Sequence, residues 1–244
     1  MNELLALWSG VFVGSVVSGF SGFAFSAAAG AVLFHVFEPQ RALPLMMGCS
    51  IASQLMTMVM LRGTVRFDPR PLLFAGGATG VALAIVGMNW VEPRTSRWLF
   101  GAFLAGYAAY LLLRRKGTTP ALRPGRLQQA FVGAVGGLVG VFTAMPGAIP
   151  SIWCELRGCS KDEQRGQVQP FILGMQMLTL MLLAPAPAGV PRDFWYQLAM
   201  ALPALFAGSF LGMQAFRRID DALVRKACMP RKLPASSAGS AMAT

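Results

Sequence analysis

The sequence predicts an all-α integral membrane protein, a polytopic helical bundle made of two inverted repeats. The first observation is composition: the 244 residues are 55% hydrophobic and 13% charged, about half the charged share of ~25% that is usual in soluble domains. The second is that seven runs lack Asp, Glu, Lys and Arg, and most reach the roughly 20 residues that a membrane-spanning helix needs. The third is that the basic residues cluster between these runs, as in membrane-protein loops. The runs comprise residues 4–37, 42–61, 71–91, 98–113, 127–154, 166–191 and 194–216.

Several classes of protein do not fit this composition. The net charge of +11 comes from short clusters rather than from one continuous face, so we expect no nucleic-acid partner. The runs also lack the alternating pattern of an outer-membrane barrel. No acidic residue or metal-type cysteine spacing lies within a run. We therefore predict a protein that is not an enzyme, with no catalytic residues, no metal site and no cofactor.

The two longest runs, residues 4–37 and 127–154, exceed one span and fall short of two full ones. Each is rich in small residues near its centre, so each could be one tilted helix or a hairpin of two helices broken at glycine. The basic residues separate these alternatives. Single spans divide the 21 Lys and Arg residues almost evenly between the two sides of the membrane, whereas hairpins place 17 on one side. Because basic loops stay cytoplasmic, we expect hairpins, with the N-terminus outside and the basic loops in the cytoplasm.

The two halves of the chain resemble each other in three places, which follow in the same order. Residues 53–60 align with 175–182, Gln40-Arg41 with Gln164-Arg165, and residues 18–22 with 136–140. An odd number of crossings in the first half makes the second half antiparallel to it, the inverted plan of many transporters.

This pattern divides the chain into four parts. We expect a first membrane repeat over residues 4–116, a basic cytoplasmic linker over 117–126, a second membrane repeat over 127–228 and a disordered polar tail over 229–244. We expect the second repeat to be one helix short, because a basic stretch follows residue 224 in place of a further apolar span.

Small-residue motifs in both halves indicate a family. The first half opens with Gly10, Gly14 and Ser18-Gly19-Phe20-Ser21-Gly22, and later has Gln40-Arg41-Ala42; the second half has Gly133 to Gly140 and then Pro146-Gly147-Ala148-Ile149-Pro150. In these features the sequence resembles the sulfite exporter TauE/SafE family over about residues 4–228. It departs from the family after Gly22, where Phe23-Ala24-Phe25-Ser26 replaces a glycine-rich stretch. The resemblance implies a multi-pass inner-membrane protein that moves sulfite, organosulfonates or related anions.

No acidic or basic residue lies within the apolar runs, so an anion would be held by backbone N–H groups at the helix breaks and by uncharged side chains. Any proton coupling would pass through the substrate's own protonation. The predicted substrate-binding residues are Ser18, Gly19, Ser21, Gly22, Gln54, Thr57, Gly137, Gly140, Thr143, Gln176 and Thr179. The alternative is that the small residues pack helices and the glutamines bond between helices. For Arg41 and Arg165, snorkelling to the interface is favoured over anion attraction.

These observations predict a permease that moves a small anion, above all sulfite or an organosulfonate, by alternating access. The alternative is a structural or assembly protein of the membrane that transports nothing. The expected partners are the anion, the lipid bilayer and, optionally, further copies of the chain.

Overall fold

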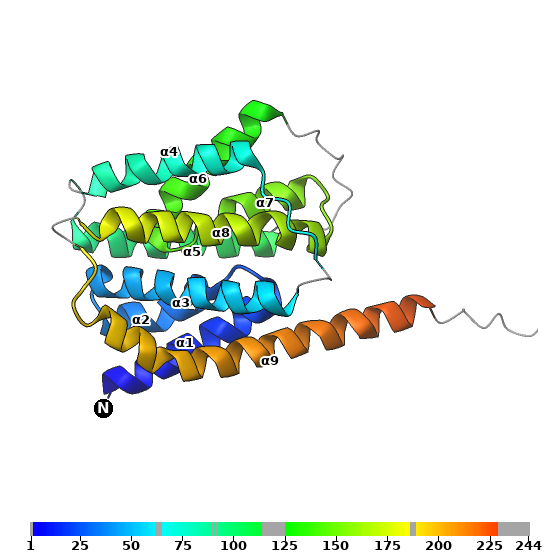
Figure 1. The fold of residues 1–244 in the computed structure, drawn as a ribbon, viewed down its shortest axis with the longest axis horizontal. Coiled ribbons are helices and arrows are strands. Elements are labelled where there is room, and N and C mark those ends of the chain that lie inside the picture. The colour runs from blue at the N-terminus through cyan, green and yellow to red at the C-terminus, as the bar shows by residue number, and fades with distance from the viewer. Residues whose placement is uncertain are drawn as a thin grey trace, which may run out of the picture.

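The computed structural model describes residues 2–61, 65–88, 90, 92–113, 125–185 and 189–228, and its regular elements are all helices (Figure 1). Five of them are long and apolar enough to cross a membrane by length and composition: residues 3–21, 39–60, 71–88, 161–183 and 194–216. The prediction of a polytopic helical membrane protein is confirmed. The helices are α1 (Asn2–Ser21), α2 (Phe25–Val36), α3 (Pro39–Met60), α4 (Pro71–Met88), α5 (Pro93–Leu113), α6 (Arg126–Thr143), α7 (Ala148–Leu156), α8 (Lys161–Leu183) and α9 (Phe194–Cys228).

Both long runs fold as the predicted hairpins. A side chain at Gly10 would meet Val32 and Leu33, and one at Gly14 would meet Ala29, so α2 folds back antiparallel along α1. In the second hairpin α7 folds back on α6, with Pro146 against Gly140. Each hairpin returns to the end of the molecule from which it started (Figure 1).

Because both hairpins return, the turns before α4 and before α8 lie at the same end of the molecule, on the right of Figure 1. There the backbone N–H of Asp68 donates to the carbonyl oxygen of Gly166 at 3.0 Å. We call this end the basic-loop end, since its described residues include Arg66, Arg70, Arg126, Arg157 and Lys161.

The two repeats run in opposite directions. In Figure 1, α1, α3 and α9 point toward the basic-loop end, whereas α4, α6 and α8 point away from it. Helices α6 to α9 thus correspond to α1 to α4 in the inverted orientation, and α5 has no counterpart in the described part of the chain. Residues 117–124 of the expected linker and the whole expected tail, 229–244, lie outside the described residues.

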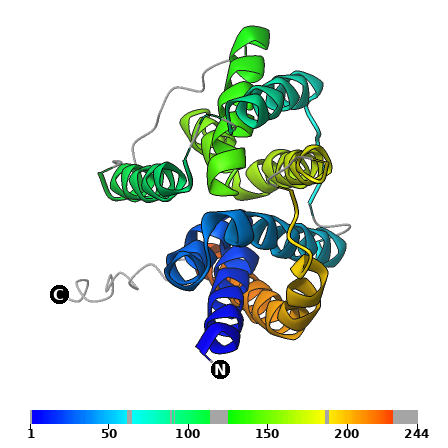
Figure 2. The same cartoon turned by 90° about the vertical axis from the view of Figure 1, so that its left-hand side faces the viewer.

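The fourth helix of each repeat packs against the other repeat: α4 packs against α6, and α9 packs against α1. Viewed from the end, α1, α2, α3 and α9 form one bundle and α4, α6, α7 and α8 form a second (Figure 2). Close glycine contacts hold α4 and α9 in these positions, because small residues let helix backbones approach in lipid. A Cβ on Gly80 of α4 would overlap the carbonyl oxygen of Ala134 in α6, and one on Gly212 of α9 would overlap the carbonyl oxygen of Val16 in α1. The repeats are therefore interlocked rather than laid side by side.

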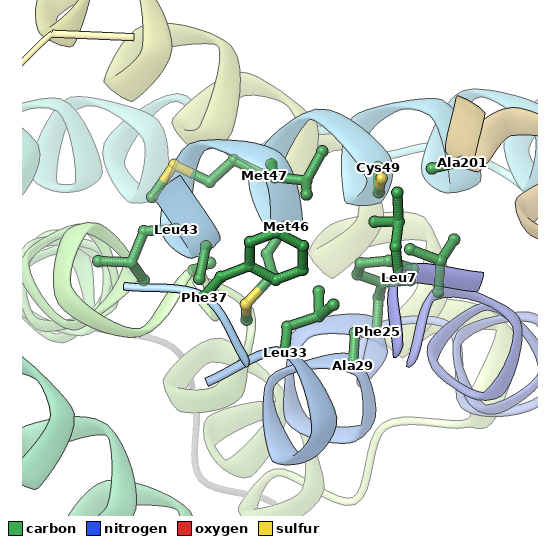
Figure 3. Packing of buried hydrophobic residues seen from close by; sticks show 14 of the residues in the cluster. Leu7, Phe25, Ala29, Leu33, Phe37, Leu43, Met46, Met47, Cys49 and Ala201 are labelled. Carbon is green, nitrogen blue, oxygen red and sulfur yellow. The ribbon is translucent and has the colours of Figure 1, made fainter. Parts of the chain in front are cut away.

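The first bundle has an apolar core toward the end opposite the basic-loop end. Leu7 of α1, Phe25 and Leu33 of α2, Met46 of α3 and Ala201 of α9 are all fully or nearly fully buried against one another (Figure 3). Residues from both repeats thus contribute to a single packed core, which fixes α2 beside the start of α3.

The glycine contact between α4 and α6 gives the first testable prediction. Changing Gly80 to Ala forces the two helices apart, because the new Cβ overlaps backbone rather than a movable side chain. We expect a loss of about 1–3 kcal/mol in unfolding free energy in detergent. Gly87, on the same helix, has nothing within 4 Å of its Cβ position, so Gly87→Ala should be neutral or stabilise by up to ~1 kcal/mol. Equal effects of the two changes would contradict the interlocked packing.

Candidate functional site

Each hairpin reverses at a residue in the left-handed backbone conformation. Gly22 has φ of +89° and Ala144 has φ of +54°. Before each break, a hydroxyl bonds back one helical turn: Ser21 to the carbonyl oxygen of Val17 at 2.8 Å, and Thr143 to that of Val139 at 2.7 Å. The same hydroxyls accept a backbone N–H just after the break, from Ala24 and from Met145. The two breaks are therefore built alike, although their sequences differ.

The carbonyl oxygen of each break residue accepts a hydrogen bond from a buried glutamine of the same repeat. The Gln54 Nε2 donates to Gly22 at 3.0 Å, and the Gln176 Nε2 donates to Ala144 at 3.1 Å. The sequence interval from Gly22 to Ala144 equals that from Gln54 to Gln176. Because an interrupted helix in a membrane exposes backbone groups that water cannot reach, these amides replace the missing helical partners.

The next turn of α3 and of α8 also carries a matched pair. Thr57 and Thr179 are both 2% exposed, and each hydroxyl donates to the carbonyl oxygen four residues earlier, in Ser53 and Met175. In this structure both threonines bond to their own helix and not across to a break.

The two breaks also meet each other, across the boundary between the bundles. The Ser26 hydroxyl, at the start of α2, donates to the carbonyl oxygen of Ala144 at 2.7 Å. The Gln169 Nε2 of α8 lies 3.5 Å from the carbonyl oxygen of Gly22, which Gln54 also reaches. Polar groups from both repeats therefore converge in one buried region, which we call the break junction.

Three serines extend the break junction toward α9. The Ser53 hydroxyl of α3 lies 3.4 Å from that of Ser18 in α1 and 3.2 Å from that of Ser209 in α9. All three are at most 1% exposed. The junction is thus closed to solvent, and the described hollows on the surface are lined by other residues.

The short helices that begin at the breaks start without a side-chain cap. The N-cap residues are Ala24 for α2 and Gly147 for α7, and neither accepts a backbone N–H through its side chain. By contrast, α8 begins near the surface with a complete capping box between Ser160 and Glu163. Uncapped N–H groups and the helix dipole favour negative charge at these positions. The break junction thus offers an anion two half-helix N-termini.

Arg165 is buried rather than extended toward the surface. Its side chain is only 4% exposed. One guanidinium nitrogen donates to the carbonyl oxygens of Phe20 at 2.6 Å and Gly19 at 3.2 Å, which are the last turn of α1. The Phe216 ring of α9 lies 3.9 Å from the guanidinium carbon. The negative end of the α1 dipole stabilises the buried cation, whereas Arg41, its expected equivalent, is exposed. The expectation that Arg165 snorkels is wrong, because α1 ends directly against it.

The family model of the sulfite exporter TauE/SafE family matches residues 6–230. The chain belongs to this family. It is therefore a multi-pass membrane protein of a family of transporters, and the break junction lies where its two repeats face each other. No curated protein and no solved structure matches the chain at a significant level.

The predicted glycines of this family member lie at helix contacts. A Cβ on Gly19 would lie 2.7 Å from the carbonyl oxygen of Ser209 in α9, and one on Gly140 would lie 2.6 Å from Pro146. A Cβ on Gly137 would overlap the carbonyl oxygen of Gly77 in α4. The close contacts explain why these positions are small, and they set the distance between the helices that surround the junction.

The predicted alignment of residues 18–22 with 136–140 is displaced by one helical turn. In the transporter's fold the counterpart of Gly22 is Ala144, not Gly140. Low-complexity apolar sequence allows such a shift, because glycines spaced four apart match in several registers.

The junction also contains five residues that are not among the predicted substrate-binding residues: Ser26, Ser53, Gln169, Ser209 and the break residue Ala144. The sequence could have indicated Gln169, since it lies one turn after Arg165 on the same helix as Gln176. Nothing in the sequence marks Ala144 as a break residue, because alanine rarely adopts a left-handed conformation.

The two break residues give a matched prediction. Gly22→Ala places a Cβ on a left-handed residue, 3.3 Å from Arg165 and from Gln169, and should cost about 1–2 kcal/mol of folding free energy. Ala144→Gly relieves the same strain in the second hairpin but adds flexibility to the unfolded chain, so the two effects nearly offset. Thermal unfolding in detergent measures both. If Ala144→Gly lowered the folding stability by more than Gly22→Ala does, the left-handed conformation of the breaks would be contradicted.

Proposed function

We propose that this chain transports a small sulfur-containing oxyanion, sulfite or an organosulfonate, by alternating access, and that the anion binds at the break junction. The supporting observation is that two interrupted helices, one from each inverted repeat, meet there through the bond from Ser26 to Ala144. Midplane sites of inverted-repeat transporters are typically made by such discontinuous helices.

The chemistry of the junction suits an anion that is bound mainly by neutral groups and helix dipoles. The N-termini of α2 and α7 provide positive dipole ends and uncapped N–H groups. Neutral polar groups within or next to the junction come from Gln54, Gln176 and the hydroxyls of Ser18, Ser21, Thr57, Thr143 and Thr179. In this structure the two amides, Ser21 and the three threonines donate to backbone carbonyl oxygens, and in our proposal they turn to the anion when it binds. Gly22 and the glycines Gly19, Gly137 and Gly140 keep the backbone close. We assign these predicted residues to the substrate site on this basis.

The motion that we propose is a rocking of the two bundles about the break junction. Each bundle is internally tight through its glycine contacts, whereas the bundles meet mainly where α3 faces α8 and at the two breaks. In this scheme the repeats span residues 4–116 and 127–228, and the basic-loop end faces the cytoplasm of an inner membrane. The excess of basic residues at that end supports this orientation.

Flux into proteoliposomes tests the proposal. Purified protein should move sulfite or sulfoacetate well above empty vesicles and above chloride. Gln54→Leu and Gln176→Leu each leave a buried break carbonyl without its amide, and we expect transport to fall by about tenfold or more. Gln40→Leu, at an exposed position, is the matched control and should transport normally.

Folding must be followed in the same samples by helical content and size-exclusion profile. Well-folded wild-type protein that moves none of these anions would overturn the proposal and favour the alternative, a non-transporting membrane protein. If Gln40→Leu lost as much flux as the buried variants, Gln54 and Gln176 could no longer be assigned to the substrate site.

A further inference from the structure

The polar groups of the pathway are distributed unequally between its two ends. Arg165, Gln169, Gln176 and Thr179 recur every three to seven residues along one buried face of α8. The sequence interval that separates Gln54 of α3 from Gln176 of α8 also separates Leu43 from Arg165 and Met47 from Gln169. Arg165 and Gln169 of α8 therefore correspond to Leu43 and Met47 on α3. Both are buried apolar residues, and Figure 3 shows them within the apolar core.

Because the repeats are inverted, this difference separates the two ends of the membrane. Arg165 and Gln169 belong to the first turns of α8, which begins at the basic-loop end. Leu43 and Met47 belong to the first turns of α3, which begins at the opposite end. At these two positions the basic-loop end therefore has a buried cation and an amide, whereas the opposite end has the apolar side chains of Leu43 and Met47.

Arg165 also joins the two bundles. It is part of α8 in the second bundle, but its hydrogen bonds go to Gly19 and Phe20 of α1, and its guanidinium lies over Phe216 of α9. Both α1 and α9 belong to the first bundle. Any separation of the bundles at the basic-loop end must break these contacts.

Gln169 adds a second feature next to the guanidinium. A Cβ at Gly22 would lie 3.3 Å from the Gln169 amide nitrogen and 3.4 Å from the Arg165 Nε, so the two side chains share one space. The Gln169 Oε1 is buried without a hydrogen-bond partner in the described structure, and the residue is 1% exposed. A buried oxygen of this kind is costly unless a donor reaches it.

We propose that Arg165 and Gln169 form an anion-recognition gate at the basic-loop end. The arriving oxyanion replaces the carbonyl oxygens of Gly19 and Phe20 as the partner of the Arg165 guanidinium, which releases α1 from α8 and opens that end to the break junction. The present bonds pair a cation with neutral carbonyl oxygens, whereas an oxyanion adds the attraction of opposite charges in a low-dielectric interior and can accept two parallel N–H bonds from the guanidinium, which favours the exchange. The Gln169 Oε1 accepts a hydrogen bond from a protonated oxygen of the anion, so the gate favours the singly protonated form, hydrogensulfite, over the dianion.

The inference rests on the proposed function, because it assigns a gate to the same anion pathway. It also gives the two sides of the pathway different affinities: the anion meets a buried cation at the basic-loop end, whereas Leu43 and Met47 offer it no polar partner at the corresponding positions.

Kinetics from the two sides of oriented proteoliposomes test the gate. Arg165→Met should raise the half-saturating sulfite concentration at the basic-loop side by about tenfold or more, with little change at the opposite side. Arg165→Lys, which keeps the charge but loses the planar fork, should give an intermediate value. Arg41→Met, the exposed arginine that also follows a glutamine, should match wild type. An unchanged value in Arg165→Met, or an equal rise on both sides, would overturn the proposal while leaving the transport function intact.

Gln169→Met is the second variant, and it keeps the arginine and the side-chain size. It should weaken hydrogensulfite binding at the basic-loop side and flatten the rise in apparent affinity that wild type shows as the pH is lowered through the second ionisation of sulfite. Retention of the full pH dependence in Gln169→Met would remove Gln169 from the gate.

Thiol accessibility provides a readout that does not require turnover. Ser18→Cys, in a background without the native cysteines, should react with a membrane-impermeant maleimide from the basic-loop side faster when sulfoacetate is present. Sulfoacetate is used because sulfite itself adds to maleimides. It has no protonated oxygen at neutral pH, so this assay reports on Arg165 and not on Gln169. The acceleration should vanish in Ser18→Cys/Arg165→Met, whereas sulfoacetate-dependent labelling that persists without Arg165 would contradict the gate. Wild-type protein that shows neither flux nor anion-dependent labelling would overturn both the gate and the proposed function.

Discussion

The fold depends on how an interrupted helix satisfies its backbone inside a membrane. A break leaves carbonyl and N–H groups with no helical partner and no water, at a cost of several kcal/mol for each group left unsatisfied. Here one amide of each repeat meets that need, from Gln54 to Gly22 and from Gln176 to Ala144. These two hydrogen bonds fix each hairpin against the long helix that follows it. They thereby place the starts of α2 and α7 in the interior.

The interlocking of the repeats follows from a second constraint, which is packing without a hydrophobic driving force. In lipid, close backbone approach replaces the burial of apolar surface as the main source of helix association. The α4–α6 and α1–α9 contacts both use glycines against backbone carbonyls. Each bundle therefore contains helices of both repeats, and the break junction lies on the boundary between the bundles. A transporter that rocks two rigid bodies needs this combination of tight bundles and a polar boundary.

The asymmetry of the two ends modifies this symmetric plan. Symmetric repeats would give a pathway with equal affinity at both ends, and such a pathway has no structural preference for capture on one side. The pair Arg165 and Gln169 breaks the symmetry with two side chains, on one helix, next to the break that they face. The burial of a cation is tolerated there because the last turn of α1 supplies carbonyl oxygens and a negative dipole end.

The amino-acid sequence alone determined the membrane class, the two hairpins, the inverted order of the repeats and the matched Gln54 and Gln176. These depend on local composition, on the length of charge-free runs and on the count of basic residues, all of which are one-dimensional quantities. Only the tertiary structure decided the register of the second break, the burial of Arg165 and the convergence of Ser26 and Gln169 on the breaks. The reason is that each of these depends on a partner far away in sequence: Ala144 is left-handed because α7 folds back on α6, and Arg165 is buried because α1 happens to end against it.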